Sequence, residues 1–389
     1  MIPKTPHHLK TFSLFILVLL LFNTITLFAQ TELKTNDTIK KELPQPKFVF
    51  KGLFQARYLT GMSDDVDING LHHSDQDAVN NSFDVKRARI QVKAIISDRT
   101  EVALLMNLAD FKSDPKNKVL ENAYLTYILN PYIKITAGQF RPTFGLENTY
   151  PIDIIKSMDF SNQYYEFGNN GWESFQIGVG ISGKVKLKEM PFSYALTVFN
   201  GNGRNQNADK DNGKQYTGRF VFGLTQKNKI NLGLNGGVGE VFDKKVYAVG
   251  IDATAEFKLQ DNLFLEMQVE AKQATNHNMY FKMEPIDRLP QISKYQMRGF
   301  YVLPNLRYEI KSHRLTSVEF SCRYENFDTN YRLESNVRQT WLPMLNFEFL
   351  KDYNARIQLG VQIDQYERNI VNTTTYNNKL FILQVQTRL

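Results

Sequence analysis

The chain has 389 residues, of which 42% are hydrophobic and 13% aromatic, and this composition excludes an intrinsically disordered protein. The formal net charge of +7 comes without a run of Lys or Arg, which argues against a nucleic-acid partner. A mean hydropathy of −0.38, and the lack beyond residue 30 of an apolar stretch near the roughly 20 residues that a spanning helix needs, exclude a helical membrane protein. Cys322 is the only cysteine, so neither an intrachain disulfide nor a CxxC zinc site can form.

The beginning of the chain is typical of an exported protein. Two lysines precede an uncharged, largely apolar stretch that ends at Ala29, a small residue suited to cleavage. We predict a secretory signal peptide over residues 1–29; the alternative is a single transmembrane anchor, for which the apolar core is short. Cleavage removes two lysines and lowers the formal net charge from +7 to +5. Residues 30–47 are polar and include two prolines, which favours a short periplasmic leader.

From residue 48 onward, apolar and polar side chains alternate with a period of two, the pattern of a β-strand with one apolar face. In one such strand Ile90 and Val92 face one side while Arg89, Gln91 and Lys93 face the other. We predict about sixteen strands, an even number as in bacterial outer-membrane barrels. They cover residues 48–58, 87–96, 100–109, 119–129, 132–140, 173–187, 191–199, 215–224, 230–239, 246–258, 262–273, 298–310, 316–326, 338–349, 353–365 and 378–389.

The predicted connections alternate between short and long along the chain. Short ones lie at residues 97–98, 130–131, 188–190, 225–229, 260–261, 311–314 and 350–352. Longer ones lie at 59–82, 110–118, 141–171, 200–214, 274–297, 327–337 and 366–377, with 240–245 as the exception. Short periplasmic turns opposite longer outer loops are typical of a transmembrane barrel, whereas a soluble sandwich has no reason to sort its loops by length.

The ends and the polar faces of these strands carry two further signals. Aromatic residues such as Tyr58, Tyr132 and Trp341 gather at strand ends, which fits the interfacial girdles of a barrel. Charged residues occupy the face opposite the apolar one, and a water-filled lumen removes the cost of burying them. We therefore predict an all-β fold, a transmembrane antiparallel β-barrel with short periplasmic turns and longer outer loops, over residues 48–389.

Three local motifs resemble the phosphate-selective porin O and P family. They are GQFRPTFGLE at residues 138–147, FNGNG at 199–203 followed by Lys214 and Arg219, and the strand at 85–92. The resemblance extends over about residues 48–389. It implies a sixteen-stranded barrel, usually trimeric, whose third outer loop folds into the lumen and narrows it. In our count of strands the third outer loop is residues 141–171, which is also the longest.

Basic residues on the predicted inner face are the candidate pore lining, because cationic groups in a narrow pore favour anions. The resemblance implies this role for four residues: Arg87, Arg89, Lys93 and Arg141. The alternation adds four more: Arg57, Lys134, Arg219 and Arg356. Acidic residues share the second half of the wall, Glu266 and Asp364 among them, so we expect a modest preference for anions.

The loop at residues 141–171 is expected to form the constriction, and its candidate residues are Phe144, Glu147, Asp153 and Lys156. Lys156 is the only lysine of this loop, where the resemblance would lead us to expect several. A lysine-rich phosphate site is therefore not predicted.

The remaining motifs are weak. Asp65, Asp67 and Asn69 copy the opening of a calcium loop, but Gln76 stands where a bidentate glutamate is needed, so an acidic, solvated outer loop is the simpler interpretation. Residues 178–184 read GVGISGK, close to a phosphate-binding loop, but they lie within an alternating strand. The chain contains neither HExxH nor GxSxG, and we predict no catalytic residue, cofactor or established metal site.

Together these patterns predict an outer-membrane porin, a diffusion channel for small solutes with a modest preference for anions such as phosphate. The expected partners are those solutes, outer-membrane lipid and lipopolysaccharide, and two further copies in a homotrimer. A non-selective general porin and a barrel-type surface adhesin without a transport role are the alternatives, and an outer-membrane hydrolase is disfavoured because no histidine falls in the body of a predicted strand.

Overall fold

The computed structural model describes residues 45–64, 66–68, 78–112, 119–206, 209, 211–225, 228–312, 314–350, 354–370 and 373–388. The expected signal peptide at 1–29, and the expected leader up to residue 44, lie outside these residues. None of the helices in this described part is long and apolar enough to cross a membrane.

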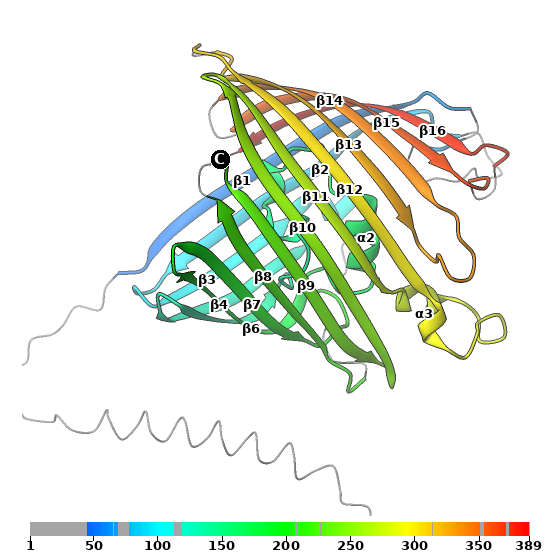
Figure 1. Cartoon of the computed structure of the whole chain (residues 1–389), viewed down its shortest axis with the longest axis horizontal. Helices are drawn as coiled ribbons and strands as arrows, with labels where there is room; N and C mark the ends of the chain where they lie inside the picture. The colour runs from blue at the N-terminus through cyan, green and yellow to red at the C-terminus, as the bar shows by residue number, and fades with distance from the viewer. Residues whose placement is uncertain are drawn as a thin grey trace, which may run out of the picture. The chain divides into compact units, whose positions relative to one another are not determined.

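Sixteen antiparallel strands form a closed barrel in which each strand pairs with its neighbours in the chain and the first pairs with the last (Figure 1). The predicted fold class is thereby confirmed. The strands are β1 (Lys47–Gly61), β2 (Asn81–Ile95), β3 (Thr100–Asn107), β4 (Leu120–Asn130), β5 (Ile133–Phe140), β6 (Gln176–Leu187), β7 (Met190–Phe199), β8 (Gln215–Thr225), β9 (Ile230–Val241), β10 (Lys244–Gln260), β11 (Leu263–Thr275), β12 (Gln296–Glu309), β13 (Ser317–Asp328), β14 (Arg338–Leu350), β15 (Ala355–Tyr366) and β16 (Asn377–Arg388).

The alternation of the sequence decides which side chains face outward. Phe50 on β1 and Phe83 on β2 are 68% and 85% exposed on the outer face, while Gln55 and Arg87, which pair across the same two strands, are buried on the inner one. A sheet that is apolar outside and polar inside can stand in lipid around a polar lumen. Closure of the barrel also leaves no unpaired strand edge in the hydrocarbon.

The connections divide the barrel into two unlike ends. Seven connections of two to seven residues join β2 to β3, β4 to β5 and so on to β15, and we call this the short-turn end. At the opposite, long-loop end the connections are mostly longer, and the exception expected at 240–245 is a two-residue turn between β9 and β10. Phe242 and Asp243 in that turn both have positive φ angles, as a tight hairpin requires.

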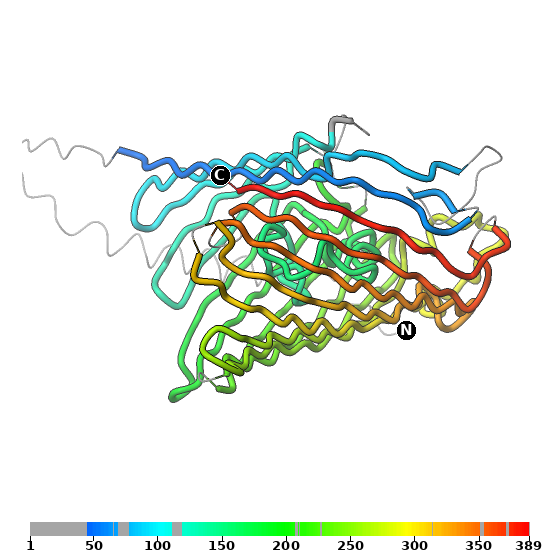
Figure 2. Tube along the Cα trace, turned by 90° about the horizontal axis from the view of Figure 1, so that it is seen from above, coloured from blue at the N-terminus to red at the C-terminus, as the bar shows by residue number. Residues whose placement is uncertain are grey.

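The longest connection, residues 141–175, turns into the barrel, and we call it the inward segment (Figure 2). It is four residues longer than predicted because β6 begins at Gln176. It contains η2 (Glu147–Thr149), η3 (Ile152–Ile154) and α2 (Asn162–Asn169). Three further short helices lie in other long-loop connections: η1 (Leu108–Lys112), α3 (His277–Lys282) and η4 (Ile292–Lys294).

Candidate functional site

Two glycines shape the inward segment near its beginning and its end. Gly145 and Gly171 have φ angles of 78° and 81°, which strain any residue with a Cβ atom. A Cβ atom at Gly145 would overlap the carboxylate of Glu173, and one at Gly171 would lie 2.5 Å from the amide nitrogen of Gln176. The segment can therefore turn inward tightly at both ends.

Helix α2 starts at a local cap inside the lumen. The hydroxyl oxygen of Ser161 accepts a hydrogen bond from the backbone N–H of Tyr164, as N-cap residues do. Ser161 in turn donates through its backbone N–H and its hydroxyl to the carboxylate of Glu147. Burial raises the pKa of Glu147 to about 7, against the opposing effect of Arg323. Glu147 was expected at the constriction, and its carboxylate instead fixes the start of α2.

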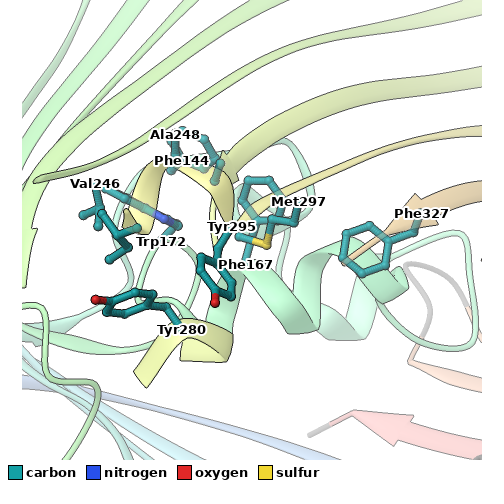
Figure 3. Close-up of a cluster of buried hydrophobic side chains, with 11 residues drawn as sticks. Phe144, Phe167, Trp172, Val246, Ala248, Tyr280, Tyr295, Met297 and Phe327 are labelled. Carbon is teal, nitrogen blue, oxygen red and sulfur yellow. The ribbon is translucent and has the colours of Figure 1, made fainter. Parts of the chain in front are cut away.

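Apolar side chains hold the segment against the wall near the long-loop end (Figure 3). Phe144 and Phe167, both on the segment, stack with ring centroids 6.1 Å apart, and Trp172 packs beside Phe144. Tyr295, just before β12, and Met297 on β12 belong to the same buried cluster. Phe144 is fully buried here, so the expectation that it lines the constriction is wrong.

A buried group of charges joins the end of the segment to β11. The Lys272 ammonium lies 2.8 Å from both carboxylate oxygens of Glu173 and 3.4 Å from Glu270, and all three side chains are fully buried. The backbone N–H of Leu146 donates to Glu270 at 2.6 Å. Burial raises the pKa of Glu173 well above its usual range, against the opposing effect of Lys272. One lysine thus serves two buried carboxyl groups.

Two arginines of the wall bind backbone carbonyl groups of the segment. Arg323 on β13 donates to the carbonyl oxygens of Asp159 and Phe160 and to the Ser157 hydroxyl. Arg356 on β15 donates to the carbonyl oxygen of Ile155 at 3.1 Å and is 2% exposed. Arg356 faces inward as expected, but the segment covers it, which corrects its assignment to the pore lining.

The inward segment thus contacts inner-face residues of β11, β13 and β15, and we call the inner face of β9–β16 the covered wall. Arg219 on β8 borders it and is 4% exposed, forming a two-point ion pair with Asp252 in which Nη2 lies 2.9 Å from Oδ1. Asn235 bonds to both partners. The charge of Arg219 is therefore neutralised locally, although the residue still lines a cavity of about 520 Å³ together with Lys134.

The inner face of β1–β5, the open wall, borders a second cavity of about 490 Å³ against the inward segment. Its charged lining consists of Lys51, Arg89, Arg141, Arg388 and the single acid Asp153. Arg89 pairs with Glu121 at 2.7 Å and Arg388 with Asp153 at 2.6 Å. Within the described part of the chain, Lys51 and Arg141 form no ion pair. The cavity therefore carries an excess of positive charge.

Aromatic rings surround Arg141. Its guanidinium carbon lies 4.5 Å from the ring centroid of Phe175, 5.5 Å from that of Phe160 and 5.9 Å from that of Tyr164. Its Nε atom is buried and has no hydrogen-bond partner. Cation–π attraction holds the side chain in place without neutralising its charge.

Nearer the long-loop end, three cations converge on one carboxylate of the segment. Asp159 lies 2.9 Å from Lys86, 2.8 Å from Arg87 and 3.6 Å from Arg57. Burial disfavours the charged form of Asp159, but these cations together hold its pKa well below the usual range. Asp84 also contacts Arg57, at 3.4 Å. Two carboxylates thus face three cations.

The other expected site residues lie apart from these groups. Lys93, toward the short-turn end, pairs with Glu101 at 2.7 Å. Lys156 bridges Glu266 at 2.9 Å and Glu319 at 3.5 Å, so it ties the segment to the covered wall. Of the expected constriction residues, only Asp153 lines the open-wall cavity.

Only part of the weak calcium candidate can be described. Asp65 and Asn69 lie outside the described residues, and Asp67 accepts a hydrogen bond from the backbone N–H of Val79 at 3.3 Å. Across the described residues no three His, Cys, Asp or Glu side chains are arranged to hold a metal ion.

Several members of the site were not expected from the sequence. The alternation predicts that Lys86 points outward. In the structure Gln55 pairs with Arg87 and Ala56 with Val85, so Lys86 forms a bulge on β2 without a partner residue on β1. Its side chain therefore points inward beside Arg87. Tyr164 was not singled out because its loop has no periodicity, and Phe175 was expected in the strand at residues 173–187 as an aromatic residue near a strand end. The position of Arg141 directly after a predicted strand was the one sequence feature that pointed to a role for it; the aromatic rings around it could not be predicted.

The comparisons with known proteins agree with this architecture. The family model of phosphate-selective porin O and P matches residues 61–237. No curated protein matches the chain. Among solved structures, the outer membrane channel DcaP of Acinetobacter baumannii is 13% identical, with a TM-score of 0.56 over 92% of this chain and 100% of that one.

Two other solved structures share the fold. OmpT of Vibrio cholerae, in a trimer form, is 12% identical, with a TM-score of 0.54 over 88% of this chain and 99% of that one. An anion-selective porin from Comamonas acidovorans is 8% identical, with a TM-score of 0.53 over 89% and 100%. The family match and the fold confirm the resemblance to the phosphate-selective porin O and P family, and they assign the chain to the integral β-barrel channels of the outer membrane.

Proposed function

We propose that this channel passes small solutes with a preference for anions, phosphate among them, and that its solute path runs through the open-wall cavity. The observation that carries the proposal is the charge of that cavity, whose lining has four cations and one acid. Two of the cations, Lys51 and Arg141, have no acidic partner among the described residues. A fixed positive excess in a narrow, low-dielectric passage lowers the energy of an entering anion and raises that of a cation.

The cations beside Asp159 extend the same field toward the long-loop end. Arg57, Lys86 and Arg87 outnumber the two carboxylates that they contact. Along β2, Arg87 and Arg89 stand two residues apart on the inner face, which places their Cα atoms about 7 Å apart. An anion entering from the long-loop end would thus meet positive charge before it reaches Arg141.

The test is the reversal potential of the purified protein in a planar bilayer under a tenfold KCl gradient. We expect an anion-selective sign, and we expect Arg141→Gln to reduce the chloride-to-potassium permeability ratio severalfold, because it removes one of the two cavity cations that lack a carboxylate partner among the described residues. Arg356→Gln is the matched control, since that arginine is covered by the segment, and it should leave the ratio nearly unchanged.

The outcomes separate the parts of the proposal. A protein that inserts and conducts with a cation-selective or neutral reversal potential is a general porin, and the anion preference is then wrong. A folded protein without channels would overturn transport itself and favour a surface adhesin.

We also propose that the chain is exported by cleavage after residue 29, contacts outer-membrane lipid and lipopolysaccharide, and assembles as a homotrimer. OmpT, which shares the fold, has a trimer form. Mass spectrometry of the mature N-terminus and light scattering in detergent test export and assembly. An intact N-terminus would contradict cleavage, and a monomeric mass would contradict the trimer.

A further inference from the structure

The lining of the open-wall cavity combines charge with flat apolar surface. Besides its four cations, the cavity is lined by Tyr124 and Phe140 of the wall and by Tyr150 and Phe175 of the inward segment. A cavity of about 490 Å³ lies within the range of roughly 300–1,000 Å³ that holds organic molecules up to drug size. The site therefore offers more than an electrostatic passage for a small inorganic ion.

From this combination we propose that the preferred solutes are small organic carboxylates with a flat apolar body, of the size of benzoate, rather than inorganic phosphate. The inference rests on the proposed anion path and names its substrate class. The carboxylate would accept hydrogen bonds from the Arg141 guanidinium, and the apolar body would lie against the aromatic lining.

The surroundings of Arg141 argue for a monovalent head group. Three rings flank its guanidinium within 6 Å, so part of its face is shielded from water. A phosphate dianion is strongly hydrated and needs several donors to replace its water. Only Lys51 adds a second cation without an acidic partner in this cavity. A carboxylate needs fewer donors, and a guanidinium can bind it through two parallel hydrogen bonds.

Open-channel block tests the proposal with two carboxylates of equal charge and with inorganic phosphate. Benzoate, acetate and inorganic phosphate are added separately to a KCl solution, and the concentration that halves the single-channel conductance is measured. Benzoate and acetate share a carboxylate and differ by the ring. We expect half-block by benzoate at a concentration about tenfold below that for acetate or phosphate.

Two substitutions at one position isolate the aromatic lining. Tyr124→Thr removes a ring from the cavity and should raise the half-block concentration of benzoate about fivefold while leaving that of acetate unchanged. Tyr124→Phe keeps the ring and should retain the block by benzoate. Arg141→Gln should weaken the block by both carboxylates.

The result on the unmodified protein decides the proposal even if Tyr124→Thr fails to insert. Equal block by benzoate and acetate, or stronger block by phosphate, would overturn the organic-carboxylate assignment while the reversal potential still supported anion preference. A reversal potential without anion preference would overturn the proposed function itself, whatever the blockers do.

Discussion

The open wall and the covered wall are built from strands of the same alternating pattern, yet their charged residues do different things. On the covered wall Lys272, Arg323 and Arg356 bind groups of the inward segment and are almost fully buried. Lys51 on the open wall and Arg141 at the start of the inward segment face a cavity and have no acidic partner among the described residues. We therefore expect a basic residue on the inner face of this barrel to contribute to selectivity only where the inward segment does not cover it.

The largest expected effect is on the free energy of unfolding, when a lysine of each wall is replaced by methionine. Lys272→Met would leave Glu173 and Glu270 buried without their cation, and breaking a buried ion pair in this way costs about 3–5 kcal/mol. Lys51→Met removes an exposed cation and should change the free energy of unfolding by less than about 0.5 kcal/mol. Urea unfolding in detergent measures both. Equal losses in the two variants would contradict the division into walls.

An intermediate effect is expected from pH, through Glu147. The folded-state pKa of this carboxyl group is raised to about 7 by burial, so the folded protein binds its proton more tightly than the unfolded chain. The resulting stabilisation is complete below the unfolded pKa near 4.5 and is lost as pH rises to about 7. The shift corresponds to roughly 3 kcal/mol.

The variant Glu147→Gln isolates the contribution of Glu147 to the pH dependence of stability. Burial lowers the pKa of His277 to about 4, so that histidine opposes Glu147 in part of the same pH window. The measurement is therefore the difference between the unmodified protein and the variant at pH 5 and at pH 8. We expect the unmodified protein to lose more stability than the variant over this interval; parallel losses would show that Glu147 does not titrate there.

The smallest effect is expected at the short-turn end. Lys93 and Glu101 form a partly exposed pair at 2.7 Å, and such pairs contribute about 0–1 kcal/mol. Lys93→Gln should therefore change the urea midpoint little and shift the reversal potential less than Arg141→Gln. A larger shift than that of Arg141→Gln would move the selective region from the cavity to the short-turn end.

The strands could be predicted because a barrel wall imposes a period of two on the sequence. Arg89 and Lys93 were placed on the inner face from this pattern, and the structure places them there. The pattern failed at Lys86, because a bulge in β2 reverses the side to which that residue points. A local β-bulge such as this one cannot be recognised from the alternation of apolar and polar residues alone.

The inward segment was harder to interpret than the wall. Its position and length could be predicted from the strand count, but the roles of its residues could not. Phe144 packs into a buried cluster, and Glu147 accepts hydrogen bonds from Ser161, the N-cap residue of α2. Both roles depend on contacts with residues distant in the sequence. The same contacts decide that Arg356 is covered while Arg141 is not.

The place of Arg141 in the chain separates two properties of the channel. It is the first residue of the inward segment and directly follows β5, so the barrel fixes its backbone, whereas Phe160, Tyr164 and Phe175 around it lie farther along the segment. A homologue could exchange the aromatic residues of the segment and acquire a new solute range while keeping the charge in place. The charge preference would then be conserved with the barrel, while the range of accepted solute shapes could change with the 35 residues of the inward segment, which lie between β5 and β6.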